Sequence, residues 1–311
     1  MLPRLVAIVG PTASGKSAIA LDLARRLGGE IVNADSRQVY RGMEIGTAGP
    51  SLAERRLVPH HLFDIAGPAD DYSLALYREQ ALAVFDEIWA RGSFPWLVGG
   101  TGQYVWALLE DWQVPAVAPD DALRGTLASF AAEHGADALH ARLREVDPLA
   151  AERIDARNVR RVIRALEVFE HTGVPISRWQ RKGQPGFEHL IFGIDVEREV
   201  LDERIGSRVE AMFAAGFVGE VRALLTDGVP PDAPAMSSIG YGEVVRHLAG
   251  ELSFAEAVDL TKRATRRLAR RQRQWFRQDD PRITWVRDAD GIEMQANIFT
   301  GACTTTVRRA R

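Results

Sequence analysis

The chain has little of what a disulfide-stapled, zinc-binding or membrane protein needs. Its 311 residues include one cysteine, Cys303, which excludes an internal disulfide and a cysteine-rich zinc site. No apolar run approaches the roughly 18 residues of a membrane span. Pro3-Arg4 leads straight into an apolar segment, so we expect no signal peptide. We therefore expect a cytoplasmic protein without a membrane partner, and we take a monomer as the working state.

A strong charge of either sign is also missing. The net charge is −3, from 39 basic and 42 acidic residues, so the whole surface does not attract polyanions. Any nucleic-acid surface must come from local clusters of arginine. The hydrophobic and charged fractions, 46% and 26%, are those of a globular protein with a sizeable core.

One segment near the start carries a specific motif. Gly10-Pro11-Thr12-Ala13-Ser14-Gly15-Lys16-Ser17 fits the phosphate-binding loop, in which two glycines separated by four residues precede Lys and Ser. The apolar run 5–9 before it predicts a buried strand, and 18–27 after it predicts a helix. Backbone N–H groups and Lys16 would then hold a diphosphate or nucleotide, and the Ser17 hydroxyl would hold Mg²⁺. The motif indicates a bound polyphosphate, but not what is transferred.

The next strands place two polar residues at strand ends. Residues 30–34 and 94–100 predict strands that are followed by Asp35 and Thr101. Since ligands of open α/β sheets bind at the carboxyl ends of strands, both residues are candidates for the site. Each could instead be a helix N-cap or turn residue. The alternation of strands and helices predicts a doubly wound parallel sheet, with an irregular segment over 37–59.

Two joints divide the chain. A Pro- and Asp-rich stretch over 115–121 and a Gly-rich stretch over 182–186 flank a segment with helical patterns alone, and 189–195 resumes a strand. We expect an α/β P-loop core over 1–115 and 189–299, an inserted all-helical module over 116–188, and a disordered tail over 300–311. Further helices are predicted over 198–214, 217–226, 240–249 and 254–278.

Two predicted helices have basic faces. In 158–171, Arg157, Arg160, Arg161 and Arg164 lie opposite an apolar stripe. In 254–278, eight basic residues between Lys262 and Arg277 have no acidic residue among them. A charge run is usually a solvated face. A bare stripe of like charge costs helix stability, however, and a polyanion would offset that cost.

Together these segments resemble the bacterial tRNA dimethylallyltransferases, also called tRNA isopentenyl transferases. The resemblance covers residues 5–277. Its matching segments are Gly10–Ser17, Asp35-Ser36 with Val39-Tyr40, Gly46-Thr47-Ala48, Pro59–Leu62, Gly99-Gly100-Thr101, Arg164–Val168, Gly216-Phe217, Glu220-Val221-Arg222, Ile239-Gly240-Tyr241, and Arg270–Gln272 with Trp275–Arg277. Two positions depart from the family pattern: Gly49 and Gly242 stand where a basic residue is usual, which removes positive charge on the expected RNA side.

The resemblance implies transfer of a dimethylallyl group from dimethylallyl diphosphate to N6 of the adenosine 3′ to the anticodon in tRNA. It implies Asp35 as the base, Arg222 as a further diphosphate clamp beside Lys16, and Thr101 as a positioning group. The residues that it assigns to contact with the anticodon stem-loop are Asp35, Ser36, Arg37, Gln38, Thr101, Arg124, Val159, Arg160, Arg161, Val162, Ile163, Ser237, Ser238, Ile239, Gly240, Tyr241, Arg270, Arg271, Gln272, Arg273, Gln274, Trp275, Phe276 and Arg277.

Two other functions fit parts of the pattern. A small-molecule P-loop kinase shares the strand–loop–helix and the helical module, and Asp195 after an apolar strand could hold its Mg²⁺. It would consume ATP. A non-catalytic RNA-binding module with a relic loop would bind RNA without any dependence on diphosphate.

Overall fold

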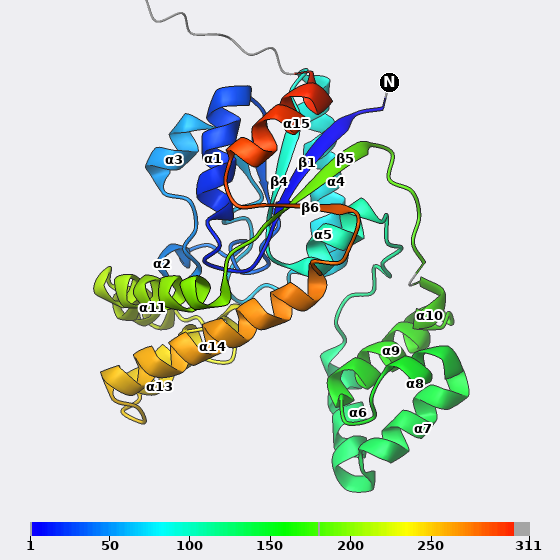
Figure 1. Ribbon diagram of the computed structural model, residues 1–311. Helices are drawn as coiled ribbons and strands as arrows, with labels where there is room; N and C mark the ends of the chain where they lie inside the picture. Colours follow the sequence, from blue (N-terminus) through cyan, green and yellow to red (C-terminus); the bar gives the residue numbers. More distant parts are fainter. Residues whose placement is uncertain (1, 180, 302–311) are drawn as a thin grey trace, which may run out of the picture. The chain divides into compact units, whose positions relative to one another are not determined.

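The computed structural model describes residues 2–179 and 181–301, and its core is one parallel sheet (Figure 1). All five strand pairings are parallel, and the six-stranded sheet has the order β3-β2-β4-β1-β5-β6. The strands are β1 Arg4–Val9, β2 Glu30–Asn33, β3 His60–His61, β4 Pro95–Gly99, β5 Glu188–Ile194 and β6 Ile283–Val286. The predicted α/β class with a parallel sheet is confirmed.

The central strand β1 is buried on both faces. Val6 and Ile8 pack with α1 Lys16–Leu27 and α15 Asp290–Thr300 in one hydrophobic cluster. Because side chains alternate along a strand, Leu5, Ala7 and Val9 point to the opposite face, and they are 0% exposed as well. Cover on both faces is what a parallel sheet needs, and it explains the continuous apolar run of β1.

Three neighbouring strands end at the same edge of the sheet. In the order β2-β4-β1, β2 ends at Asn33, β4 at Gly99 and β1 at Val9. The residues that follow are Asp35, Thr101 and the loop that begins at Gly10. The topology therefore brings the three sequence-predicted elements of the site to one edge.

The chain separates into two compact units. The first contains residues 1–72, 77–105 and 186–311, and the second 73–76 and 106–185. The helices outside the second unit's own bundle are α2 Glu44–Thr47, α3 Leu52–Leu57, α4 Leu74–Ala90, α5 Gly102–Leu109, α11 Arg198–Ala214, α12 Phe217–Thr226, the 3₁₀ helix η1 Pro234–Ser237, α13 Tyr241–Leu248 and α14 Phe254–Trp275. The expected boundaries at 115/116 and 188/189 stay predictions.

Within its described residues, the second unit is helical and has its own core. Its bundle consists of α6 Asp121–His134, α7 Ala136–Val146, α8 Pro148–Arg153, α9 Val159–Thr172 and α10 Ile176–Trp179. Leu139, Leu143, Val162 and Leu166 lie in one hydrophobic cluster of these helices. Glu167 of α9 is 0% exposed and binds the guanidinium groups of two arginines, which fastens α6 to α9.

Sequence periodicity located the long helices and missed short elements. Predicted helices 198–214 and 217–226 coincide with α11 and α12. The segment expected to be irregular contains α2 and α3, and β6 and α15 were not predicted. The predicted tail begins at Thr300, which is the last residue of α15, and residues 302–311 lie outside the described residues. In the described part of the chain, no helix combines the length and apolar character of a membrane span.

A buried carboxylate joins β2, β3 and α4 at the amino end of the sheet. Glu30 is 7% exposed and accepts hydrogen bonds from Arg91 Nε and Nη2, each at 2.7 Å. His61 Nε2 lies 2.7 Å from Glu30 Oε2, the oxygen that also accepts from Arg91 Nη2. These hydrogen bonds, that of Arg91 above all, lower the pKa of Glu30 from 4.5 to about 2 despite burial.

This lowered pKa predicts a pH-dependent contribution to stability. A carboxylate with a depressed folded pKa stabilises the fold above its unfolded pKa, and that stabilisation is lost as the pH falls from 4.5 toward 2. We expect Glu30→Gln to lower the free energy of unfolding by about 2 kcal/mol at pH 7. Urea unfolding at pH 7 and pH 3 measures the difference between variant and wild type, which should shrink at pH 3. An equal difference at both pH values would contradict the assignment.

Candidate active site

The phosphate-binding loop lies between β1 and α1 with its backbone turned for anion binding. Gly10 and Gly15 have φ of 150° and 96°, in the region that side chains disfavour. Gly15 caps α1, so the first amides of the helix open at the loop. Lys16 Nζ donates to the carbonyl of Pro11 at 3.3 Å and is buried, whereas Ser17 is exposed. This arrangement matches the expected cradle for a polyphosphate.

Lys16 shares its surroundings with one carboxylate and one guanidinium. Burial, together with the charge of Arg208, lowers the pKa of Lys16 to about 8, and the charge of Asp35 opposes the shift. Burial likewise lowers the pKa of Arg208, again opposed by Asp35. The negative charge of Asp35 thus favours the charged form of both cations.

Asp35 is held by a buried asparagine. The Asn33 side chain, 0% exposed, accepts from Asp35 N at 2.8 Å and donates to the carbonyls of Asp35 and Leu62. Asp35 Oδ1 accepts from Arg37 N at 3.0 Å, which is an Asx turn. The turn uses one carboxylate oxygen and leaves Oδ2 for another proton donor.

Thr101 lies beside this turn. Its Oγ1 accepts from Ser36 N at 3.0 Å and donates to Ser36 Oγ at 3.3 Å, and its amide donates to the carbonyl of Ala34. Gly99 makes the approach possible, because a Cβ there would lie 2.1 Å from the Ala34 carbonyl oxygen. Thr101 and the turn that carries Asp35 are thus joined directly.

A cavity of about 280 Å³ opens at the loop. Three of its lining side chains, Lys16, Arg204 and Arg208, are basic, and none is acidic. Arg204 Nη1 donates to the Ser14 carbonyl at 3.4 Å, and Arg208 Nη2 donates to the Thr47 carbonyl at 3.3 Å. Such a lining suits an anion with several oxygens.

Sequence reasoning missed the two arginines at this cavity and predicted Arg222 as the clamp, a role that stays a prediction. Arg222, expected as the diphosphate clamp, is exposed on α12 and is absent from the described residues that line this cavity. Val221 and Phe217 of the same helix are buried in a separate hydrophobic cluster. The available signal was the spacing of Arg204 and Arg208, which lie four residues apart on one face of the predicted helix 198–214.

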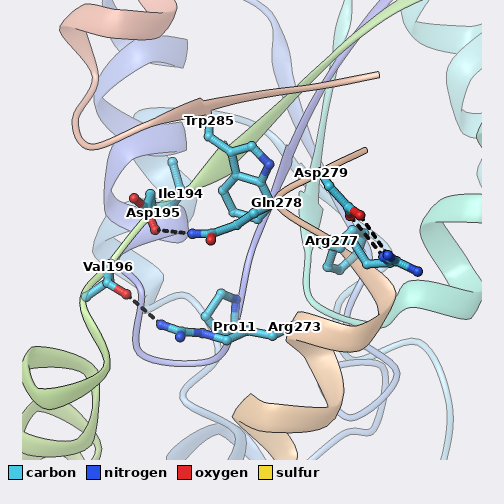
Figure 2. Close-up of a pocket in the computed structure, with 10 residues that line it drawn as sticks. Pro11, Ile194, Asp195, Val196, Arg273, Arg277, Gln278, Asp279 and Trp285 are labelled. Carbon is cyan, nitrogen blue, oxygen red and sulfur yellow. Dashed lines mark hydrogen bonds and ion pairs between the residues drawn. The ribbon is translucent and has the colours of Figure 1, made fainter. Parts of the chain in front are cut away.

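A second cavity, of about 370 Å³, lies on the β5 side of the loop. Figure 2 shows Gln278 reaching Asp195 Oδ1, at 2.9 Å, and Arg273 reaching the carbonyl of Val196. Arg277 is turned toward Asp279, with which it forms two hydrogen bonds. Pro11 of the phosphate loop lines this cavity too, so the C-terminal end of α14 and the loop line the same cavity.

The comparisons with known proteins agree with this geometry. The family model for IPP transferase matches residues 38–279, and that for isopentenyl transferase matches residues 3–58. The chain is 51% identical over 296 residues to the tRNA dimethylallyltransferase of Roseiflexus castenholzii, covering 95% of this chain and 96% of that protein. It is 51% identical over 286 residues to that of Geobacter metallireducens, covering 91% and 92%. This chain belongs to the tRNA dimethylallyltransferase family.

A solved structure supports the same family. The tRNA isopentenylpyrophosphate transferase of Bacillus halodurans superposes with a TM-score of 0.68 at 40% identity, covering 96% of this chain and 95% of that one. The kinase interpretation is therefore wrong. A P-loop on a parallel sheet does not distinguish the two classes, whereas a match over nearly the whole chain does. Membership in a family of transferases equally rules out the non-catalytic RNA-binding module.

The residues expected to contact tRNA in the first unit fall into two groups. Ser36, Arg37 and Gln38 are partly exposed, and Arg37 Nη1 donates to Ser237 Oγ at 3.2 Å, which joins two of the expected segments. Ser238 and Tyr241 are buried, at 4% and 0% exposed, and Ile239 is partly buried. Gly240 is buried as well. The second group therefore lies beneath the surface that the exposed residues form.

The basic run of α14 divides in the same way. The exposed members are Arg270, Arg271, Gln274, Trp275 and Arg277, and Arg273 is partly buried. Gln272 and Phe276 are 5% and 1% exposed. Gln272 Oε1 accepts from Thr12 N at 2.7 Å, so this side chain braces the phosphate loop. Its expected contact with RNA is corrected to a structural one.

The basic run contains no acidic residue, but acidic residues outside it neutralise its first turns. Lys262 pairs with Glu210, Arg263 with Asp259, and Arg266 with Asp202. Arg270 and Arg271 have no acidic partner among residues 2–179 and 181–301. The unneutralised charge therefore lies near the end of the helix that reaches the phosphate loop.

In the second unit, two of the expected cations are free. Arg160 and Arg161 are exposed on α9 and, in the described part of the chain, form no ion pair. Val162 and Ile163 are buried in the bundle core, and Val159 packs at its margin. Arg124 is bound to the buried Glu167, so its charge is compensated inside the unit. An RNA contact by this unit is best sought at Arg160 and Arg161.

The placement of Arg208 and Arg222 predicts that loss of the first weakens anion binding and that loss of the second does not. Arg208→Ala should weaken the binding of inorganic diphosphate by about 10- to 100-fold, because a hydrogen bond between charged groups is worth about 1.5 to 3 kcal/mol. Arg222→Ala is the matched control, another arginine on a neighbouring helix, and should stay within about twofold of wild type. Isothermal titration measures both. Loss of affinity in Arg222→Ala with none in Arg208→Ala would restore the original assignment.

Proposed function

We propose that this protein transfers the dimethylallyl group of dimethylallyl diphosphate to N6 of the adenosine 3′ to the anticodon in tRNA, releasing diphosphate. The observation that carries the proposal is that Lys16 and Arg208 line one cavity at the phosphate loop and that the charge of Asp35 acts on both, in a chain of the tRNA dimethylallyltransferase family. Two cations suit the leaving diphosphate, and the carboxylate suits the amine proton.

In this mechanism the C–O bond to the diphosphate breaks while positive charge develops on the allylic carbon. Loop amides, Lys16, Arg204 and Arg208 hold the negative charge that accumulates on the leaving oxygens. The N6 lone pair forms the new C–N bond. The N6 proton passes to Asp35, whose Oδ2 is not used by its own turn. Thr101, joined to Ser36, positions the acceptor side.

The proposed cofactor is Mg²⁺. Ser17 is exposed and lines the cavity with Lys16, which supports its hydroxyl as one ligand. Among the described residues no group of three or more His, Cys, Asp or Glu could hold a metal. The donor set therefore fits an ion that is held mainly by diphosphate oxygens and water, as Mg²⁺ often is. When bound, the ion would neutralise charge on the diphosphate.

The proposed RNA partner is the anticodon stem-loop. The adenine must leave its stack at a cost of a few kcal/mol, which contacts to the neighbouring nucleotides must offset. Exposed groups near the site, Arg37, Gln38 and Ser237, are proposed for base contacts. Exposed cations, Arg270 and Arg271 in one unit and Arg160 and Arg161 in the other, are proposed for phosphates. We also propose a monomer located in the cytoplasm.

The decisive experiment follows label from dimethylallyl diphosphate into unmodified tRNA. Asp35→Asn should reduce transfer at least about 100-fold, because general-base catalysis contributes about 10²- to 10⁴-fold. Its affinity for tRNA should stay within about threefold of wild type. Asp195→Asn is the control, since Asp195 also follows a core strand but lines the second cavity. It should remain within about threefold in both measurements.

Two outcomes would count against the assignment. Collapse of tRNA affinity in Asp35→Asn, with turnover on bound tRNA preserved, would make Asp35 an RNA ligand rather than the base. Absence of any label transfer by the wild-type protein would reject the proposed function itself.

A further inference from the structure

Three segments far apart in the sequence meet at one carboxylate. Glu220 of α12 accepts from Ile45 N at 2.7 Å with Oε2 and from Gly46 N at 3.0 Å with Oε1. The hydroxyl of Tyr241, at the start of α13, donates to Glu220 Oε1 at 2.7 Å. The same hydroxyl lies 3.1 Å from the carbonyl of Met43, which precedes α2. Glu220 and Tyr241 therefore hold the amino end of α2 from one side.

The side chains around the Glu220 carboxylate are closely packed. A Cβ on Gly46 would lie 2.3 Å from the ring of Phe217 and 2.5 Å from the Tyr241 ring and hydroxyl. Tyr241 and Phe217 are 0% exposed and their rings meet edge to face at 4.9 Å. Burial raises the pKa of Glu220, and its hydrogen bonds to Tyr241, Ile45 and Gly46 oppose that shift. The Glu220 carboxylate is thus partly desolvated, and its oxygens accept hydrogen bonds from the α2 backbone.

The opposite end of α2 reaches the active site. The carbonyl of Thr47, its last residue, accepts from Arg208 Nη2 at 3.3 Å and from Gln38 Nε2 at 3.0 Å. The carbonyl of Ala48 accepts from Gln38 at 3.1 Å, and Ala48 lines the basic cavity. Because α2 is a four-residue turn, fixing its first amides also fixes these last carbonyls.

We propose that Glu220, with Tyr241, is a positioning residue for the transfer reaction: through α2 it sets where Arg208 meets the diphosphate. Glu220 is not among the described residues that line the cavity, so we assign it a positioning role and not a catalytic one. The proposal rests on the proposed function. It gives a physical role to three of the motifs noted in the sequence, around Gly46, Glu220 and Tyr241, that no catalytic step uses.

The test is steady-state kinetics of Glu220→Gln with dimethylallyl diphosphate as the varied substrate. In the Gln variant an NH₂ group replaces one carboxylate oxygen and faces a backbone N–H of α2 that donated to that oxygen. Two donors cannot bond to each other, so α2 loses one of the hydrogen bonds that hold its amino end. We expect kcat/KM for dimethylallyl diphosphate to fall about tenfold. Glu30→Gln is the matched control, because Glu30 is another buried carboxylate with several hydrogen bonds, at the far end of β2. It should lose stability and keep kcat/KM within about twofold.

A double-mutant cycle distinguishes positioning from general destabilisation. If Glu220 acts through Arg208, Glu220→Gln should add less than about twofold to the loss caused by Arg208→Lys alone. Multiplication of the two losses in the double variant would overturn the proposal. A Glu220→Gln variant with wild-type kcat/KM would also overturn it.

Tyr241→Phe keeps the test available if Glu220→Gln does not fold. It removes one hydroxyl, so kcat/KM for dimethylallyl diphosphate should fall about threefold with circular dichroism unchanged. Wild-type kinetics in a folded Tyr241→Phe would again contradict the proposal. A wild-type protein that transfers no label would instead reject the proposed function, so the two failures are distinguishable.

Discussion

The proposed site depends on one electrostatic arrangement at the carboxyl edge of the sheet: the charge of one carboxylate, Asp35, favours the charged forms of a buried lysine and a guanidinium. Lys16 and Arg208 both lose some basicity through burial, and Asp35 opposes this in both cases. Without the carboxylate, two neighbouring cations would repel each other in a poorly solvated space. A bound diphosphate would supply far more negative charge than Asp35 does. The pocket is thus only partly neutralised by the protein itself.

The sheet and α14 hold this arrangement in place. Parallel pairing of β2, β4 and β1 ends three strands at one edge, and Gly99 lets the turn after β2 approach the turn after β4. From the other side, Gln272 accepts from the loop amide of Thr12. A Cβ on Gly100 would lie 2.3 Å from the Gln272 amide nitrogen, so the helix and the strand end are in close contact. The helix that carries Arg270 and Arg271 is therefore hydrogen-bonded to the phosphate loop through Gln272.

Local patterns made part of the site predictable. The phosphate loop has a motif whose spacing is itself the mechanism, and Asp35 and Thr101 follow from the rule that strand ends converge. The spacing of Arg204 and Arg208 placed both on one helix face, but their role, like that of Glu220, depends on which faces of α11 and α12 pack inward. Arg222 was identified from its motif, and its side chain is exposed on α12, so its role as a clamp stays a prediction. Gln272 and Tyr241 lay in expected RNA-contact segments and are buried.

The central claim is that one pocket holds the diphosphate and the acceptor amine between Lys16, Arg208 and Asp35. A crystal structure with an unreactive analogue of dimethylallyl diphosphate and an anticodon stem-loop tests it most directly. The account predicts diphosphate oxygens within hydrogen-bond distance of Lys16 and Arg208, and an unstacked adenine whose N6 lies within that distance of Asp35. An adenine bound elsewhere, or a diphosphate away from both cations, would contradict it.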